Sequence, residues 1–219
     1  MKILAVVAHP DDHVLWMGGT ILRLNSWEWH ILSLCNSHND DFDPKEKSFN
    51  LSCKELGIKK YEALKFKDYQ SRELMEIEQS LKMQREILAF ADKEYDLIFT
   101  HSMWPECEYD FHANHLEARD SVNRLVDEKL LIAKGIIYFC FKSGGCQQPV
   151  IADEDRADYK LELVQEEINT KRELKNFFSS WAEGDLRGLA LWDNDELKIE
   201  AFNFKKFTEV ELPQDFIKI

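Results

Sequence analysis

Short apolar runs alternate along this chain with longer segments in which apolar residues recur at helical spacing. The first run, residues 3–8, has the length and β-branched content of a strand buried on both faces. Residues 29–35, 61–66, 95–100 and 135–141 are also typical of strands, and the segments 13–24, 43–57, 76–93, 115–131 and 164–181 are typical of helices. Repeated strand–helix units favour a three-layer α/β fold with a mainly parallel sheet and right-handed crossovers.

The whole chain, residues 1–219, is predicted to form a single domain. A length of 219 residues is enough for one sizeable α/β core, and no linker-like segment divides the sequence. Strand and coil are expected after residue 188. The sequence therefore predicts one sheet with one functional edge.

The charge balance restricts the class of partner. Lysine and arginine number 28 and aspartate and glutamate number 41, which gives a formal net charge of −13. Such a chain repels the phosphate backbone of nucleic acid and anionic membrane surfaces. We therefore expect a small-molecule substrate and no nucleic acid, and the sequence is compatible with a homo-oligomer.

The cysteines and the first apolar run indicate a compartment. The chain has five cysteines, an odd number, and no CxxC pair, which argues against a disulfide framework and a cysteine-based zinc site. The first apolar run is too short for a signal sequence and far too short to span a membrane. These features predict a reduced, cytoplasmic setting.

The clearest chemical signal follows the first predicted strand, in the run His9-Pro10-Asp11-Asp12-His13. Pro10 cannot continue a hydrogen-bonded strand, so the strand ends there. In open α/β sheets, ligands bind at the carboxyl ends of the strands. Two adjacent carboxylates beside an imidazole repel one another and lose hydration, and a divalent cation would compensate for both costs. The alternative is a polar turn in which Asp11 or Asp12 caps the next helix.

A second polar cluster follows the fourth predicted strand, in the run Asp110-Phe111-His112-Ala113-Asn114-His115. On a helix, His112 and His115 would project from one face, and neutral imidazole suits Zn²⁺. Taken alone, such a pair is more often two surface histidines beside a helix start. The two clusters together are more informative, because the carboxyl ends of parallel strands share one edge of the sheet. Together the clusters can supply three protein ligands, which with an open water position make a catalytic zinc site.

These runs carry a resemblance. The segments His9-Pro10-Asp11-Asp12, Gly18-Gly19-Thr20, Thr100-His101-Ser102 and His112-x-x-His115, with Leu15, resemble the PIG-L/LmbE-type family of metal-dependent N-acetylglucosamine deacetylases. Weaker matches extend over nearly the whole chain, at 84–88, 171–174, 179–180, 187–188 and 200–202. The resemblance implies a Rossmann-like α/β domain with its active site at the carboxyl ends of the strands.

The resemblance also implies a reaction and roles. It implies a zinc-dependent hydrolase that removes the acetyl group from an N-acetylated, GlcNAc-type sugar conjugate, with Fe²⁺ or another divalent ion as the alternative cofactor. The implied metal ligands are His9, Asp12 and His115. Asp11 is the implied general base, and His112 stabilises the developing oxyanion or protonates the leaving amine. A competing assignment exchanges Asp11 and Asp12; we keep the family order because the motif matches position by position.

Two residues depart from the family pattern. His13 stands where the family usually has glutamate, and it is read either as an added ligand or proton carrier or as a histidine on the rim of the site. Asn114 stands where the family usually has aspartate. Because an amide cannot stabilise an imidazolium as a carboxylate does, Asn114 predicts weaker activity or a shifted pH profile.

Three residues are predicted to contact the substrate. Trp104 precedes the second cluster, and aromatic faces often pack against sugar rings. Asp68 and Arg72 follow the third predicted strand on the same edge, where Arg72 could meet an anionic group of the conjugate or could simply be an exposed loop residue. Two other functions stay open: a catalytically weak or inactive sugar-binding homologue, and a metal-dependent hydrolase of another amide.

Overall fold

The computed structural model describes residues 1–35, 44–67, 76–102, 113–143, 150–178 and 198–219. In the first part of the chain, strands and helices alternate as β1 (Lys2–Val7), α1 (Asp12–Arg23), β2 (Glu28–Cys35), α2 (Pro44–Glu55), β3 (Lys60–Phe66), α3 (Ile77–Phe90), β4 (Glu94–Thr100), α4 (Ala113–Asp127) and β5 (Ile132–Phe139). The second part contains β6 (Phe141–Ser143), β7 (Val150–Ala152), β8 (Tyr159–Glu162), α5 (Gln165–Asn176), β9 (Ile199–Lys206) and β10 (Ile217–Lys218).

The main sheet has eight strands in the order β10-β8-β9-β5-β4-β1-β2-β3. The five strands from β5 to β3 are parallel, which confirms the predicted mainly parallel α/β fold. The strand-like tail enters the sheet as β9, which pairs antiparallel with both β5 and β8. The short strands β6, β7 and β8 were not predicted, because segments of three or four residues carry too little hydrophobic pattern.

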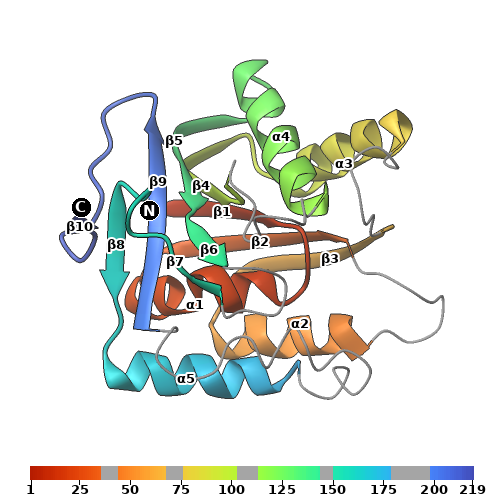
Figure 1. The fold of residues 1–219 in the computed structure, drawn as a ribbon. Helices are drawn as coiled ribbons and strands as arrows, with labels where there is room; N and C mark the ends of the chain where they lie inside the picture. Colours follow the sequence, from red (N-terminus) through yellow and green to blue (C-terminus); the bar gives the residue numbers. More distant parts are fainter. Residues whose placement is uncertain (36–43, 68–75, 103–112, 144–149, 179–197) are drawn as a thin grey trace.

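The layers are visible in Figure 1, where α1, α2 and α5 lie on one face of the sheet and α3 and α4 on the other. The first strand explains why its sequence is apolar throughout. Its alternate residues Ile3 and Val7 enter the core under α1, whereas Leu4 and Val6 enter the core under α3 and α4. Since both faces of β1 are covered, every side chain from residue 3 to 7 is buried.

The helices correspond closely to the predicted segments. The segment predicted at 13–24 is α1, and the segment predicted at 164–181 contains α5, which ends at Asn176; residues 179–181 of that segment lie outside the described ranges. Over the described parts of the chain, none of the helices combines the length and the apolar character needed to cross a bilayer.

Candidate metal centre

The candidate centre lies where two neighbouring parallel strands end. β1 pairs directly with β4, with Ala5 opposite Phe99. The residues that follow β1, namely His9 to Asp12, therefore lie beside His101, which follows β4. His115 comes from the first turn of α4. The structure thus confirms that the two polar clusters share one edge of the sheet, as far as their described residues show.

His9, Asp12 and His115 converge on one point. Each offers a ligand atom within 4.8 Å of the others. His9 Nδ1 lies 3.1 Å from His115 Nε2, and Asp12 Oδ2 lies 3.6 Å from each of these nitrogens. Ligands placed tetrahedrally about 2.1 Å from a zinc ion lie roughly 3.4 Å from one another. Two imidazoles and one carboxylate at these separations therefore fit a divalent metal ion.

Asp12 is held in place by a hydrogen bond to each of its carboxylate oxygens. Its Oδ2 accepts a hydrogen bond from the backbone N–H of His9 at 2.7 Å, and its Oδ1 accepts one from Nε1 of Trp16 at 2.9 Å. His101 Nε2 lies 3.2 Å from Oδ2. The two hydrogen bonds fix the orientation of the Asp12 carboxylate.

His101 lies beside the three candidate ligands without belonging to them. Its Nε2 accepts a hydrogen bond from the backbone N–H of Ala8 at 2.9 Å, so the lone pair of that nitrogen is already used. The His101 ring stacks on the ring of His115, with centroids 3.9 Å apart. His101 therefore supports the ring of His115, a role that sequence reasoning missed although the strand-end position of Thr100-His101-Ser102 was a signal.

The two adjacent aspartates have opposite electrostatic properties. Burial disfavours the ionised form of Asp12, but the nearby imidazoles of His115, His101 and His9 outweigh it and hold the pKa of Asp12 well below its usual range. For Asp11, burial and then the charge of Asp12 raise the pKa. Asp11 occupies the N-cap position of α1, yet its side chain makes no capping hydrogen bond. Simple helix capping therefore does not account for this pair.

His13 occupies neither of the positions considered for it. Its ring is fully buried, with Nε2 2.9 Å from Oγ of Ser52 and ring centroids 5.1 Å from Phe49 and 6.3 Å from Phe178. Burial lowers the pKa of His13 to about 4, so the ring is neutral at neutral pH. The structure corrects both interpretations: His13 packs α1 against α2 and the end of α5, and it is neither a ligand nor a rim residue.

Restoring the family glutamate at position 13 should therefore destabilise this protein. A His13→Glu carboxylate would be buried between two phenylalanines and close to the charge of Asp12, and we expect the free energy of unfolding to fall by roughly 3 kcal/mol. Urea denaturation at pH 7 measures this change. His13→Gln is the matched control, since a neutral amide can still bond to Ser52. A His13→Glu variant as stable as wild type would contradict the packing role.

Four other predicted site residues lie outside the described residues: Asp68, Arg72, Trp104 and His112. Their predicted roles stay predictions. Asn114 is buried in the first turn of α4. Trp16 is buried, and its Nε1 donates a hydrogen bond to Asp12.

A family profile described as "PIG-L: GlcNAc-PI de-N-acetylase" matches residues 4–126, which is more than half of the chain and includes every residue of the candidate centre. This chain belongs to the PIG-L family. The match confirms the resemblance drawn from the motifs. A comparison with curated proteins found no match.

Solved structures resemble this PIG-L family member over most of its length. N,N'-diacetylchitobiose deacetylase from Pyrococcus horikoshii has a TM-score of 0.58 and 18% identity, over 94% of this chain and 84% of that one. The 4-carboxy-2-hydroxymuconate hydratase GalB from Pseudomonas putida has a TM-score of 0.56 and 14% identity, over 97% of this chain and 98% of that one. The zinc-inhibited form of teicoplanin deacetylase Orf2 has a TM-score of 0.56 and 13% identity, over 87% of this chain and 89% of that one. At these identities the likeness establishes the fold.

Proposed function

We propose that this PIG-L family member is a metal-dependent N-deacetylase that hydrolyses the acetamide of an N-acetylated, GlcNAc-type sugar conjugate. Family membership supports a hydrolytic deacetylase. The observation that carries the metal requirement is the convergence of His9 Nδ1, Asp12 Oδ2 and His115 Nε2 at separations of 3.1–3.6 Å. These three residues are the proposed ligands.

The chemistry that a divalent ion supplies at such a site is Lewis acidity, which polarises an amide carbonyl and lowers the pKa of water. The chain's own residues then have separate tasks. Asp12, ionised and held by His9 N–H and Trp16, serves as ligand and not as base. Asp11, whose carboxyl has a raised pKa and caps no helix, takes the proton from the attacking water.

The remaining tasks are assigned to residues outside the described ranges. We propose that His112 stabilises the negative charge on the amide oxygen or protonates the leaving amine, and that Asp68, Arg72 and Trp104 contact the sugar conjugate. The spacing of His112 from His115 and the family motif support the first assignment. The other three rest on their places after predicted strands.

Zn²⁺ is the proposed native ion, with Fe²⁺ or another divalent ion as the alternative. Two histidines and one carboxylate suit both Zn²⁺ and Fe²⁺. A related deacetylase has been solved in a zinc-inhibited form, so the identity of the ion needs a direct measurement. A hydratase has the same fold, so the reaction that this protein catalyses also needs a direct measurement.

The function is tested by amine release. Protein stripped of metal should release no amine from N-acetylglucosamine conjugates, and addition of one equivalent of Zn²⁺, Fe²⁺ or Co²⁺ should restore release with at least one ion. N-acetylated alkylamines of similar size serve as the control for another amide hydrolase. Elemental analysis of the protein as purified identifies the bound ion.

Two results would replace this proposal with its alternatives. Binding of the sugar conjugate with no amine released under any metal would indicate a sugar-binding homologue. Equal turnover of the alkylamide controls would indicate an amide hydrolase without sugar specificity.

A further inference from the structure

Helix α1 is broken directly after the candidate metal centre. Met17 has φ −145° and ψ 15°, which lie outside the helical region, so α1 consists of a first turn that begins at Asp12 and a second segment that continues to Arg23. Backbone N–H groups at the start of a helical segment have no carbonyl partner within that segment. The second segment therefore needs acceptors from elsewhere in the chain.

Glu200 supplies those acceptors from β9, 180 residues away along the chain. Its Oε1 accepts the N–H of Gly19 at 2.8 Å, and its Oε2 accepts the N–H of Thr20 at 2.8 Å and the Thr20 hydroxyl at 2.6 Å. The carboxylate is fully buried. A negative charge at this end of a helical segment is favoured by the helix dipole as well as by the hydrogen bonds.

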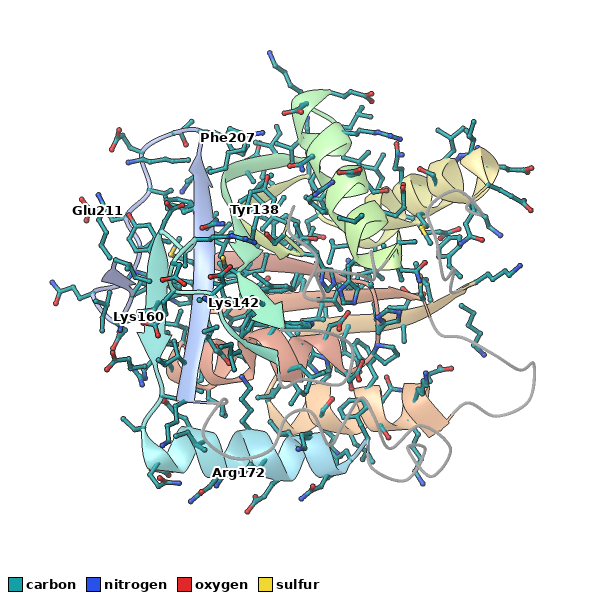
Figure 2. All side chains as sticks on the ribbon, viewed as in Figure 1. Tyr138, Lys142, Lys160, Arg172, Phe207 and Glu211 are labelled. Atoms are coloured by element: carbon teal, nitrogen blue, oxygen red, sulfur yellow. The ribbon has the colours of Figure 1, made fainter. Side chains whose placement is uncertain are left out.

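Lys171 of α5 balances this buried charge. Its Nζ lies 2.5 Å from Oε1 of Glu200, and only 1% of the residue is exposed. Figure 2 shows the next residue, Arg172, on the outer side of α5 and away from the sheet. Removing both charges from water is costly, and such pairs contribute little net stability. This cost suggests a role beyond stability.

The second segment packs closely against a neighbouring side chain. A Cβ atom on Gly19 would lie only 2.3 Å from Cδ2 of Leu163, so any larger residue at position 19 would force that leucine side chain to move. Glu200 and Lys171 thus anchor a segment whose backbone is already in contact with its neighbours.

The first turn of α1 lies between the metal centre and the break at Met17. That turn begins at Asp12 and ends at Trp16, whose Nε1 donates to Asp12 Oδ1 at 2.9 Å. We propose that Glu200, with its charge balanced by Lys171, is a positioning residue for the metal centre: it fixes the break at Met17 so that Trp16 holds Asp12 toward His9 and His115. This inference rests on the proposed function, because it concerns the same centre.

The chain offers a matched control for ordinary helix packing. Arg23 and Glu167 also join α1 to α5 through an ion pair, with Nε to Oε1 at 2.5 Å and Nη2 to Oε2 at 2.6 Å. This pair lies at the far end of α1, away from Met17. If Glu200 only held the two helices together, loss of either pair would affect the metal centre equally.

The experiment is a Co²⁺ titration of metal-free protein that follows both affinity and the visible absorption spectrum. We expect Glu200→Gln to weaken Co²⁺ binding roughly 10–100-fold and to change the spectrum, as loss of an outer partner of a ligand does. Thr20→Val removes only one hydrogen-bond donor to Glu200. It should therefore change the Co²⁺ affinity and the spectrum in the same direction as Glu200→Gln, but by a smaller amount. Glu167→Gln should keep wild-type affinity and spectrum, even where its urea midpoint falls.

A double variant tests the route through Trp16. If Glu200 acts through that indole, Trp16→Phe/Glu200→Gln should bind Co²⁺ no more weakly than the weaker single variant. Additive losses would overturn the inference, and so would wild-type binding and spectrum in folded Glu200→Gln and Thr20→Val. Wild-type protein that binds Co²⁺ no better than His115→Ala would overturn the proposed metal centre and this inference together.

Discussion

Asp11→Asn should lower kcat by about 10²–10⁴-fold while the protein keeps its fold and its metal, because an amide cannot take the proton that a general base removes from water. The two aspartates are adjacent, but only Asp12 has both carboxylate oxygens committed, to His9 N–H and to Trp16. Burial and the charge of Asp12 raise the pKa of Asp11, which makes it the better proton acceptor. The measurements are kcat and metal content of purified Asp11→Asn.

Asp12→Asn is the comparison that decides the assignment. Loss of a charged ligand should release the ion from Asp12→Asn, so its activity should be low and should recover in part at high metal concentration. The roles of the two residues would be exchanged if Asp11→Asn turned over normally while Asp12→Asn kept its metal and lost activity.

His115→Ala should abolish tight metal binding. His115 Nε2 is one of three converging donor atoms, 3.1 Å from His9 Nδ1 and 3.6 Å from Asp12 Oδ2. Its loss should cost more than the roughly 10–100-fold in affinity that follows loss of an outer partner. It should also leave Asp12 and His9 unable to complete a three-residue site. Elemental analysis after dialysis, and a Zn²⁺ titration of the stripped protein, measure the effect.

His30→Ala is the control for loss of a buried imidazole. His30 is 3% exposed and lies near the start of β2, where its Nδ1 is 2.9 Å from the Tyr95 hydroxyl. This variant should lose stability but keep its metal. Equal metal content in wild type, His30→Ala and His115→Ala would remove His115 from the proposed site.

The order of strands and helices could be predicted because it depends on local pattern. The apolar run before His9 required a strand buried on both faces, and Pro10 required that strand to end. The sequence did not predict that β9 would enter the sheet antiparallel between β5 and β8. That pairing joins residues such as Phe139 and Phe202, and strand pairing between distant segments leaves no periodic signal in either one.

The sequence by itself determined which residue types lie at the carboxyl edge of the sheet: histidine and aspartate after β1, and histidine at the start of α4, which follows β4. The tertiary structure decided that β1 and β4 are neighbours. Only the tertiary structure decided what each side chain does there. In the folded chain the His13 side chain is buried in the core, and the His101 ring stacks on His115. Trp16 donates a hydrogen bond to Asp12, and Glu200 accepts hydrogen bonds from the backbone that follows the break in α1. The physical reason is that a motif fixes which residue types follow a strand, whereas the direction of each side chain depends on packing against segments far away in the chain.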